Sequence, residues 1–252
     1  MAEWAWDPDD FAALWIGDRS DRIPNILRYT SRFAYRDDVA AHRLAVRRGY
    51  DAGELELIEL AMNTLTASDL RIEIIGGTTT YQGSNGSQPR VYRIIGARTT
   101  SHAAVLHQFT QGDRDGQFRL CLCRTENLPA RIVATIPAAP AGTQPPITVH
   151  PSDIREGRPS RTGNSPAERY RRIFDGPMHG SGAATLRAGA FNATPAPWNR
   201  LAWYDIPDGR YTETRAENVT VRPVSAQDLA ARFAAWINTA VDRLREDEDE
   251  PW

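Results

Sequence analysis

The chain has 252 residues, a formal net charge of −2 and a hydrophobic fraction of 41%, so it can bury a full core and falls outside the compositional class of disordered proteins. This small charge gives no overall field that would attract nucleic acid or an anionic membrane. All 30 basic residues are arginine, which excludes the lysine chemistry of Schiff bases and phosphate-binding P-loops.

The first half of the chain is predicted to form helices and then strands. Apolar residues at helical spacing predict a short helix after Asp7 and further helices over residues 37–48, 51–67 and 128–136. Alternating or apolar extended runs predict strands over residues 23–29, 70–74, 91–95, 103–109 and 118–124. A polar loop, residues 76–89, separates two of these strands, and Asp115–Gly116 marks a hairpin turn.

The second half repeats this order after a segment rich in Pro, Gly, Ser and Thr. Helices are expected over residues 166–174 and 226–244, with strands over residues 184–191, 201–206, 211–215 and 218–224. The repetition predicts two related half-domains, residues 1–137 and 165–245, joined by a linker over residues 138–164 and followed by an acidic tail, residues 246–252. In this alignment, the Asp115–Gly116 turn matches Asp208–Gly209, and residues 128–132 match residues 229–233.

Antiparallel hairpins flanked by helices, without alternating βαβ units, are typical of the α+β class. We expect one central antiparallel sheet built by both halves, with helices gathered at each end. No apolar run reaches the roughly 18 to 20 residues of a membrane span, and the acidic N-terminus does not resemble a secretion signal. We therefore expect a cytoplasmic protein.

No residue pattern in the sequence matches a known catalytic or metal site. The five histidines lack metal-ligand spacing, and His179 lies in a predicted turn that is not a G-x-S-x-G nucleophile loop. Cys121 and Cys123 would share one face of a strand, but two ligands are too few for structural zinc, so we interpret them as buried apolar residues. We expect no cofactor and no metal.

The predicted C-terminal helix begins with a variant of the capping box, at Ser225 and Asp228. Behind it, an apolar stripe that includes Phe233, Trp236 and Ile237 repeats every three or four residues. Most of this stripe is expected in the core. Trp236 widens the stripe, and a core position is favoured for it over an exposed groove.

The order and spacing of several short motifs resemble the EspG family, cytosolic chaperones of actinobacterial type VII (ESX) secretion. The motifs are Asp10-Phe11-x-x-Leu14-Trp15, Arg172-Ile173-Phe174, Pro177, Gly180-x-Gly182, Leu201-Ala202-Trp203-Tyr204-Asp205 and Asp208-Gly209-Arg210-Tyr211. The resemblance implies a pseudo-twofold α+β fold, with a central antiparallel sheet flanked by two helical bundles. It also implies a protein without enzymatic activity that binds the apolar tip of a PPE protein in a PE–PPE heterodimer, keeps it soluble and directs it to its secretion system.

The resemblance also implies where a partner would bind: on the sheet face, on the loop between early strands and on the C-terminal helices. In this sequence those regions contain Tyr81, Asn85, Arg90, Arg93, Phe233, Trp236 and Ile237. We expect a monomer or weak homodimer that binds neither nucleic acid nor a membrane. Two alternatives remain open, an α+β scaffold without a PPE partner and an enzyme that uses His179 or His107 with a carboxylate.

Overall fold

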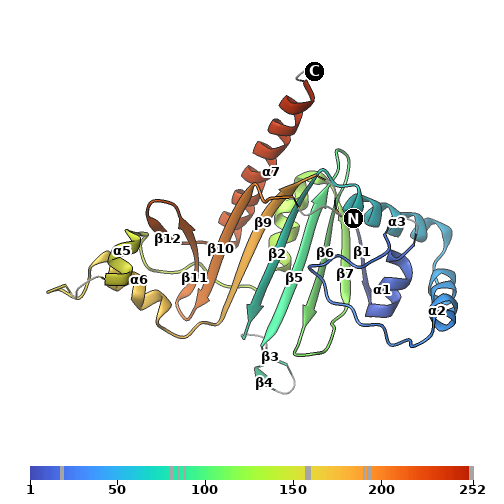
Figure 1. Ribbon diagram of the computed structural model, residues 1–252, viewed down its shortest axis with the longest axis horizontal. Coiled ribbons are helices and arrows are strands. Elements are labelled where there is room, and N and C mark those ends of the chain that lie inside the picture. The colour runs from blue at the N-terminus through green and yellow to red at the C-terminus, as the bar shows by residue number, and fades with distance from the viewer. Residues whose placement is uncertain are drawn as a thin grey trace.

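The computed structural model describes residues 1–17, 20–79, 82–83, 86–87, 89–156, 160–189, 191 and 195–249. Ten strands form one antiparallel sheet in the order β1-β7-β6-β5-β2-β9-β10-β11-β12-β8 (Figure 1). They are β1 (Ala2–Trp6), β2 (Leu70–Thr78), β5 (Arg90–Arg98), β6 (Ala103–Thr110), β7 (Phe118–Cys123), β8 (Ile147–Val149), β9 (Gly180–Ala188), β10 (Asn199–Ile206), β11 (Gly209–Arg215) and β12 (Val219–Pro223). A small ribbon pairs β3 (Gln82–Gly83) with β4 (Gly86–Ser87).

The helices lie between and beside these strands. They are α1 (Pro8–Trp15), α2 (Arg36–Arg48), α3 (Ala52–Thr66), α4 (Leu128–Thr135), α5 (Pro151–Glu156), α6 (Pro166–Phe174) and α7 (Ala226–Asp249). Each helix predicted from periodicity is present, to within a few residues at its ends. The antiparallel α+β class is confirmed.

The strand order is symmetric about the pairing of β2 with β9, which joins the two halves at the sheet centre. Moving outward, β5, β6, β7 and β1 on one side correspond to β10, β11, β12 and β8 on the other. Each half begins with its outermost strand and ends with a helix, α4 or α7. The fold is therefore a pseudo-twofold duplication.

The segment expected to be a linker contains regular structure. It includes the edge strand β8 and the helix α5, which occupy the places that β1 and α1 take in the first half. Both are short and bordered by proline, so their local pattern is weak. The hairpin alignment was also displaced by one strand: Asp115–Gly116 lies between β6 and β7, whereas Asp208–Gly209 lies between β10 and β11 and matches the β5–β6 turn.

The strand predicted over residues 23–29 is wrong, because this segment is irregular. It lies against β6 through the buried side chain of Gln108, whose Nε2 donates to the Arg28 carbonyl at 2.7 Å while its Oε1 accepts from the Arg28 amide at 2.9 Å. A side-chain amide thus supplies the two hydrogen bonds that a strand partner would have made.

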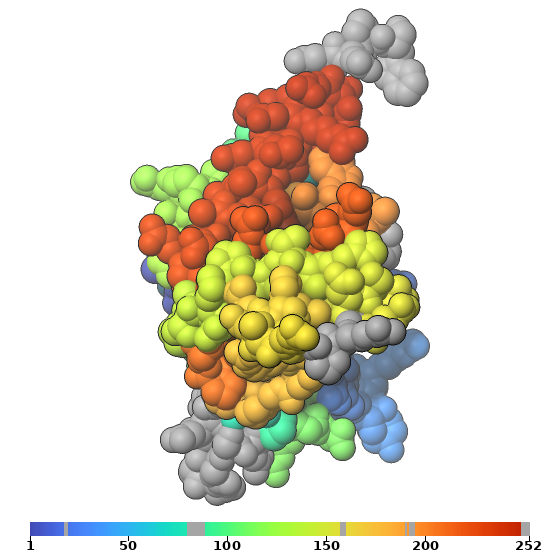
Figure 2. All heavy atoms as spheres, turned by 90° about the vertical axis from the view of Figure 1, so that its left-hand side faces the viewer, coloured from blue at the N-terminus to red at the C-terminus, as the bar shows by residue number. Residues whose placement is uncertain are grey.

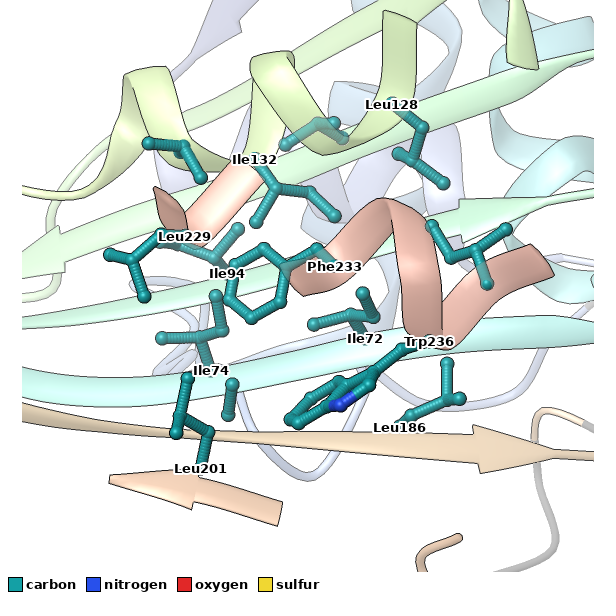
Figure 3. Packing of buried hydrophobic residues seen from close by; sticks show 14 of the residues in the cluster. Ile72, Ile74, Ile94, Leu128, Ile132, Leu186, Leu201, Leu229, Phe233 and Trp236 are labelled. Carbon is teal, nitrogen blue, oxygen red and sulfur yellow. The ribbon is translucent and has the colours of Figure 1, made fainter. Parts of the chain in front are cut away.

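One face of the sheet, the α7 face, is covered by α4 and α7. Figure 3 shows Phe233 and Trp236 of α7 packed over Ile72 and Ile74 of β2, with Ile132 of α4 beside them. Because this cluster includes strands from both halves, the two halves share one core. The apolar stripe predicted for the last helix forms much of its contact with the sheet.

The opposite face is covered only at its two ends. At one end α1 and α3 pack on β5, β6 and β7, and at the other α6 packs on β8, β11 and β12. Figure 2 shows α5 and α6, in yellow, at the second end, and α7, in red, rising beyond them. The central strands therefore remain uncovered on this face, which is turned toward the viewer in Figure 1.

Two aromatic rings on the α7 face lie directly over glycine backbone near the sheet centre. Tyr92 of β5 lies over Gly76 of β2, and Trp203 of β10 lies over Gly182 of β9. The Tyr92 hydroxyl donates to the Ser181 carbonyl at 3.0 Å. Both glycines belong to strands that are longer than predicted, because β2 extends to Thr78 and β9 begins at Gly180.

Candidate functional site

Four neighbouring strands, β5, β2, β9 and β10, expose side chains in the uncovered centre of the opposite face. Their register aligns Arg93, Ile75, Ala183 and Ala202 in one row and Val91, Gly77, Ser181 and Tyr204 in the next. We call these eight residues the open strip. It crosses the boundary between the two halves.

The middle of the open strip is apolar and shallow. Ile75 is 50% exposed and Val91 is 37% exposed, although both belong to strands of the central sheet. Beside them lie the small residues Gly77, Ser181 and Ala183. Large exposed apolar side chains above a floor of small residues are typical of a surface that a partner covers.

The exposure of Ile75 follows from the strand period. Ile72 and Ile74 point into the core under α7, so the side chain of Ile75 must point to the opposite face. The adjacent isoleucines at residues 74 and 75 therefore indicate an exposed apolar side chain on the opposite face. A strand with one buried face needs only one of two successive residues to be apolar.

One rim of the open strip is a fixed ionic group. Glu73 accepts from Arg71 Nε at 2.8 Å through Oε1 and from Arg187 Nε at 2.9 Å through Oε2. Arg71 also donates to the Gly189 carbonyl at 3.0 Å. With two guanidinium groups and one carboxylate, this rim has an excess of positive charge in a preorganised geometry.

Arg93 lies at the β5 end of its row in the open strip. Its Nη1 donates to Thr110 Oγ1 at 2.7 Å. Burial lowers the pKa of Arg93, and the charge of nearby Arg28 lowers it further. The guanidinium stays charged at neutral pH, so the first-half side of the open strip is also positive.

Tyr204 borders the open strip toward the second half. Its ring packs edge-to-face against Phe174 of α6, with centroids 4.9 Å apart. Burial raises the pKa of the Tyr204 hydroxyl, and the nearby carboxylate of Glu213 raises it further. This hydroxyl is therefore neutral at physiological pH and gives the strip an aromatic wall with a polar tip.

The residues predicted to bind a partner do not lie on one surface. Arg93 is in the open strip, but Arg90 is three residues earlier on β5 and points to the α7 face, where it lines a cavity with Thr78 and Phe109. Tyr81 and Asn85 lie outside the described residues.

Phe233, Trp236 and Ile237 are 0%, 7% and 4% exposed, and all three lie in the core between α7 and the sheet (Figure 3). A partner seated on this conformation would not touch them. Their packing instead fixes the position of α7. Helical spacing alone could not separate these two roles, because both give the same stripe.

Within the described ranges, no group of three or more His, Cys, Asp or Glu side chains could bind a metal ion. The backbone of His179 accepts from the Thr79 amide and donates to the Asp205 carbonyl, both at 2.7 Å, but its ring has no hydrogen bond or ion pair in the described part of the chain. Cys121 and Cys123 are free thiols, half-buried and buried. No described helix has both the length and the apolar content that crossing a bilayer requires.

Comparisons with known proteins identify the family and a solved structure of similar fold. A family model described as the EspG family matches residues 7–235, whereas a comparison with curated proteins gives no sequence match. The Mycobacterium tuberculosis type VII secretion system chaperone EspG5, solved in complex with the PE25–PPE41 dimer, is 15% identical and has a TM-score of 0.56, with 91% of this chain and 94% of that chain covered. At that identity the likeness shows the fold alone.

HtdX of Mycobacterium tuberculosis is 11% identical over 88% of this chain and 100% of that chain. Its TM-score is 0.20, too low to support an argument.

Proposed function

This chain belongs to the EspG family, and from that premise we propose that it is a type VII secretion chaperone. It binds the apolar helical tip of a PPE protein in a PE–PPE heterodimer, keeps it soluble and directs it to its secretion system. The observation that supports this most directly is the fold that the chain shares over nearly its full length with EspG5, a chaperone solved with a PE25–PPE41 dimer. The protein acts in the cytoplasm as a monomer or weak homodimer, without enzymatic activity or cofactor.

The open strip is the surface we assign to the partner. An apolar helical tip presents bulky side chains, and the small floor around Ile75 leaves room for them above the sheet. Covering Ile75 and Val91 removes their apolar area from water in both proteins. Tyr81 and Asn85 extend this assignment to the loop between β2 and β5. Arg90 points to the α7 face, outside the open strip, and Phe233, Trp236 and Ile237 contribute by holding α7.

The charged rims favour one orientation of the partner. Arg93, opposite Ile75 on β5, and Arg187, held by Glu73 beyond the next row, are positive at the edges of the open strip, so acidic residues flanking the apolar tip would pair with them. Such complementarity mainly accelerates association and excludes wrong partners.

The test is co-expression with candidate PE–PPE pairs, followed by size exclusion and calorimetry. We expect a stoichiometric complex, and Ile75→Asp should weaken it about tenfold or more because the carboxylate is desolvated at the centre of the contact. Leu57→Asp is the matched control, since Leu57 is 44% exposed on α3, outside the open strip. It should leave the affinity unchanged.

The possible outcomes test the proposed function and the assigned binding surface separately. Failure to bind any candidate pair would contradict the chaperone proposal. Normal binding by Ile75→Asp would keep the function and reject the open strip. Trp236→Ala should lower binding only as far as it lowers thermal stability, which differential scanning calorimetry measures.

A further inference from the structure

A groove runs along the α7 face beside α4, away from the open strip. Near the turn between β6 and β7 it widens into a cavity of about 710 Å³, and toward β1 it continues as a second cavity of about 410 Å³. Both are lined by His107, Arg119, Ala134 and Thr135, so they adjoin. We call these two cavities the α4 groove. Their sizes fall in the range of small-molecule sites.

The α4 groove combines an apolar floor with a positive edge. Val105, Phe109 and Ile136 line the floor. Both of its carboxylates lie in ion pairs, Glu3 with Arg131 at 3.3 Å and Asp115 with Arg28 at 3.5 Å, although the buried Oδ1 of Asp115 makes no hydrogen bond to a described residue.

Two further arginines, Arg114 and Arg119, have no side-chain hydrogen bond or ion pair within the part of the chain that the structure describes. After the ion pairs are counted, the remaining charge of the groove is positive and belongs to Arg114 and Arg119. These guanidinium groups favour an anionic ligand.

His107 lies on β6 between the floor residues Val105 and Phe109 and lines both cavities. It is directly opposite Arg119 in the β6–β7 register, and both ring nitrogens are buried without a hydrogen-bond partner among the described residues. Burial, and then the charge of Arg119, lowers the pKa of His107 to about 4. At neutral pH the ring is therefore uncharged, with one N–H donor and one acceptor. Buried imidazole nitrogens without partners are costly, and a ligand that bonds to one of them would recover part of that cost.

We infer that the α4 groove binds a small carboxylic acid with an apolar body. Its carboxylate lies between Arg114 and Arg119 and accepts from the N–H of His107, and its apolar body covers Phe109 and Ile136, which line the same cavity. Planar guanidinium groups favour a carboxylate of this kind, since they can bind both oxygens at once. A neutral ligand would leave the two arginines unpaired, and an amine would be repelled by them.

The test uses octanoate as the probe with the full chain, followed by calorimetry. Octanol and acetate are the two controls: the first lacks the charge and the second lacks the apolar body. We expect saturable binding of octanoate at millimolar concentration or below, and much weaker binding of both controls. Octanol binding as well as octanoate would overturn the carboxylate assignment, and no saturable octanoate binding would overturn the site.

Two variants test whether octanoate binds at Arg119 and His107. Arg119→Gln should weaken octanoate binding about tenfold, because it removes a charge-assisted bond, whereas Arg232→Gln on the exposed surface of α7 is the matched control. His107→Phe removes both ring nitrogens but retains an aromatic ring of similar size, so it should weaken binding without lowering thermal stability. Unchanged affinity in both variants would contradict the inference.

A proton-linked readout distinguishes binding at His107 from a general loss of folding. Bound octanoate offsets the field of Arg119, so the pKa of His107, followed by NMR of its ring protons, should rise. The other charged or titratable groups that line this groove are Glu3, Arg90, Arg114, Asp115, Cys121 and Arg131. An unchanged His107 titration in saturating octanoate would place the ligand elsewhere. This inference does not depend on the proposed function, because it concerns the other face of the sheet.

Discussion

At the scale of single residues, the packing at the sheet centre depends on two glycines, at which no larger side chain would fit. A methyl group at Gly76 would overlap the Tyr92 ring, and one at Gly182 would overlap the Trp203 ring. The two pairs are equivalent under the pseudo-twofold, so an aromatic ring packs on a glycine of the neighbouring strand on both sides of the β2–β9 junction. Glycine in a strand interior often marks such a close approach.

We therefore expect Gly76→Ala and Gly182→Ala each to lower the free energy of unfolding by about 1–3 kcal/mol, the usual range for overpacking a dense core. Urea denaturation followed by tryptophan fluorescence measures this. Gly77→Ala is the control on the same strand, because a Cβ there would make an ordinary contact, 3.7 Å from the Arg90 carbonyl oxygen. Equal losses at residues 76 and 77 would contradict the role of the aromatic rings.

A buried ion pair makes a second strong contribution at this scale. Arg210, 2% exposed, donates to Asp205 through Nε at 2.6 Å and Nη2 at 2.9 Å, and its Nη2 also donates to the Pro137 carbonyl at 2.7 Å. Asp205→Ala should cost about 3–5 kcal/mol of stability, since it leaves a buried charge without its partner. Chemical denaturation checks this. Asp21→Asn, which breaks an exposed pair with Arg22, should change little.

At the scale of elements, α6 begins with a complete capping box. Ser165 Oγ accepts from the Glu168 amide at 3.3 Å, and Glu168 Oε2 accepts from the Ser165 amide at 2.7 Å. Glu168 also accepts from the hydroxyl and amide of Ser160, at 2.6 and 2.9 Å. These bonds, the Ser160 hydroxyl first among them, lower the pKa of Glu168 from 4.5 to about 2.

This shift gives α6 a defined pH dependence. A lowered carboxyl pKa stabilises the fold fully above the unfolded value of 4.5, and the contribution is lost as pH falls toward about 2. The difference in melting temperature between the wild type and Glu168→Gln should therefore be constant near neutral pH and shrink below pH 4.5. Ser160→Ala should show part of the same difference. A gap that does not change with pH would contradict the assignment.

Sequence patterns predicted long elements well and short ones poorly. The helices α2, α3 and α7 have enough periodic residues to define them, whereas β1, β8 and α5 are stabilised by partners far away in the chain. The sequence predicts a loop that begins at Gly76, because glycine is common in loops, although the aromatic packing on Gly76 shows why a strand needs it.

The candidate site was predictable only in part. The spacing of Arg90 and Arg93 on one strand already requires that they point to opposite faces. The burial of Phe233 and Trp236 required tertiary packing, because an apolar stripe looks the same whether it contacts the sheet or a partner. Exposed Ile75 could have been identified from the adjacent isoleucines once the extent of β2 was known.

At the scale of the whole molecule, both halves share one core, so we expect them to unfold together. The cluster under α7 joins β2 and β5 to β9 and β10, and α4 packs against α7. Urea unfolding should give coincident transitions by circular dichroism and by tryptophan fluorescence. Trp6 and Trp15 in the first half and Trp203 and Trp236 in the second make the fluorescence sensitive to both halves.

A fragment covering residues 1–140 should accordingly not fold alone, but should recover native-like spectra when mixed with residues 141–252. The mixing experiment is followed by circular dichroism. Two separate transitions in the intact chain, or a cooperative transition in either fragment, would contradict a single unit. Deletion of residues 245–252 is the control, because the described side chains of this end are exposed and its loss should leave the transition unchanged.

The mirrored strand order also dictates what happens while the chain leaves the ribosome. Once residue 123 has emerged, β1, β7, β6, β5 and β2 can pair, but β2 is then an open edge. Its partner β9 ends at residue 188, 65 residues later, which takes roughly 3–13 s at about 5–20 residues per second. Throughout that interval Ile72 and Ile74 lack the cover of α7, the last element made. A nascent chain of this fold therefore exposes an unpaired strand edge until β9 pairs with β2, and an uncovered apolar sheet face until α7 follows.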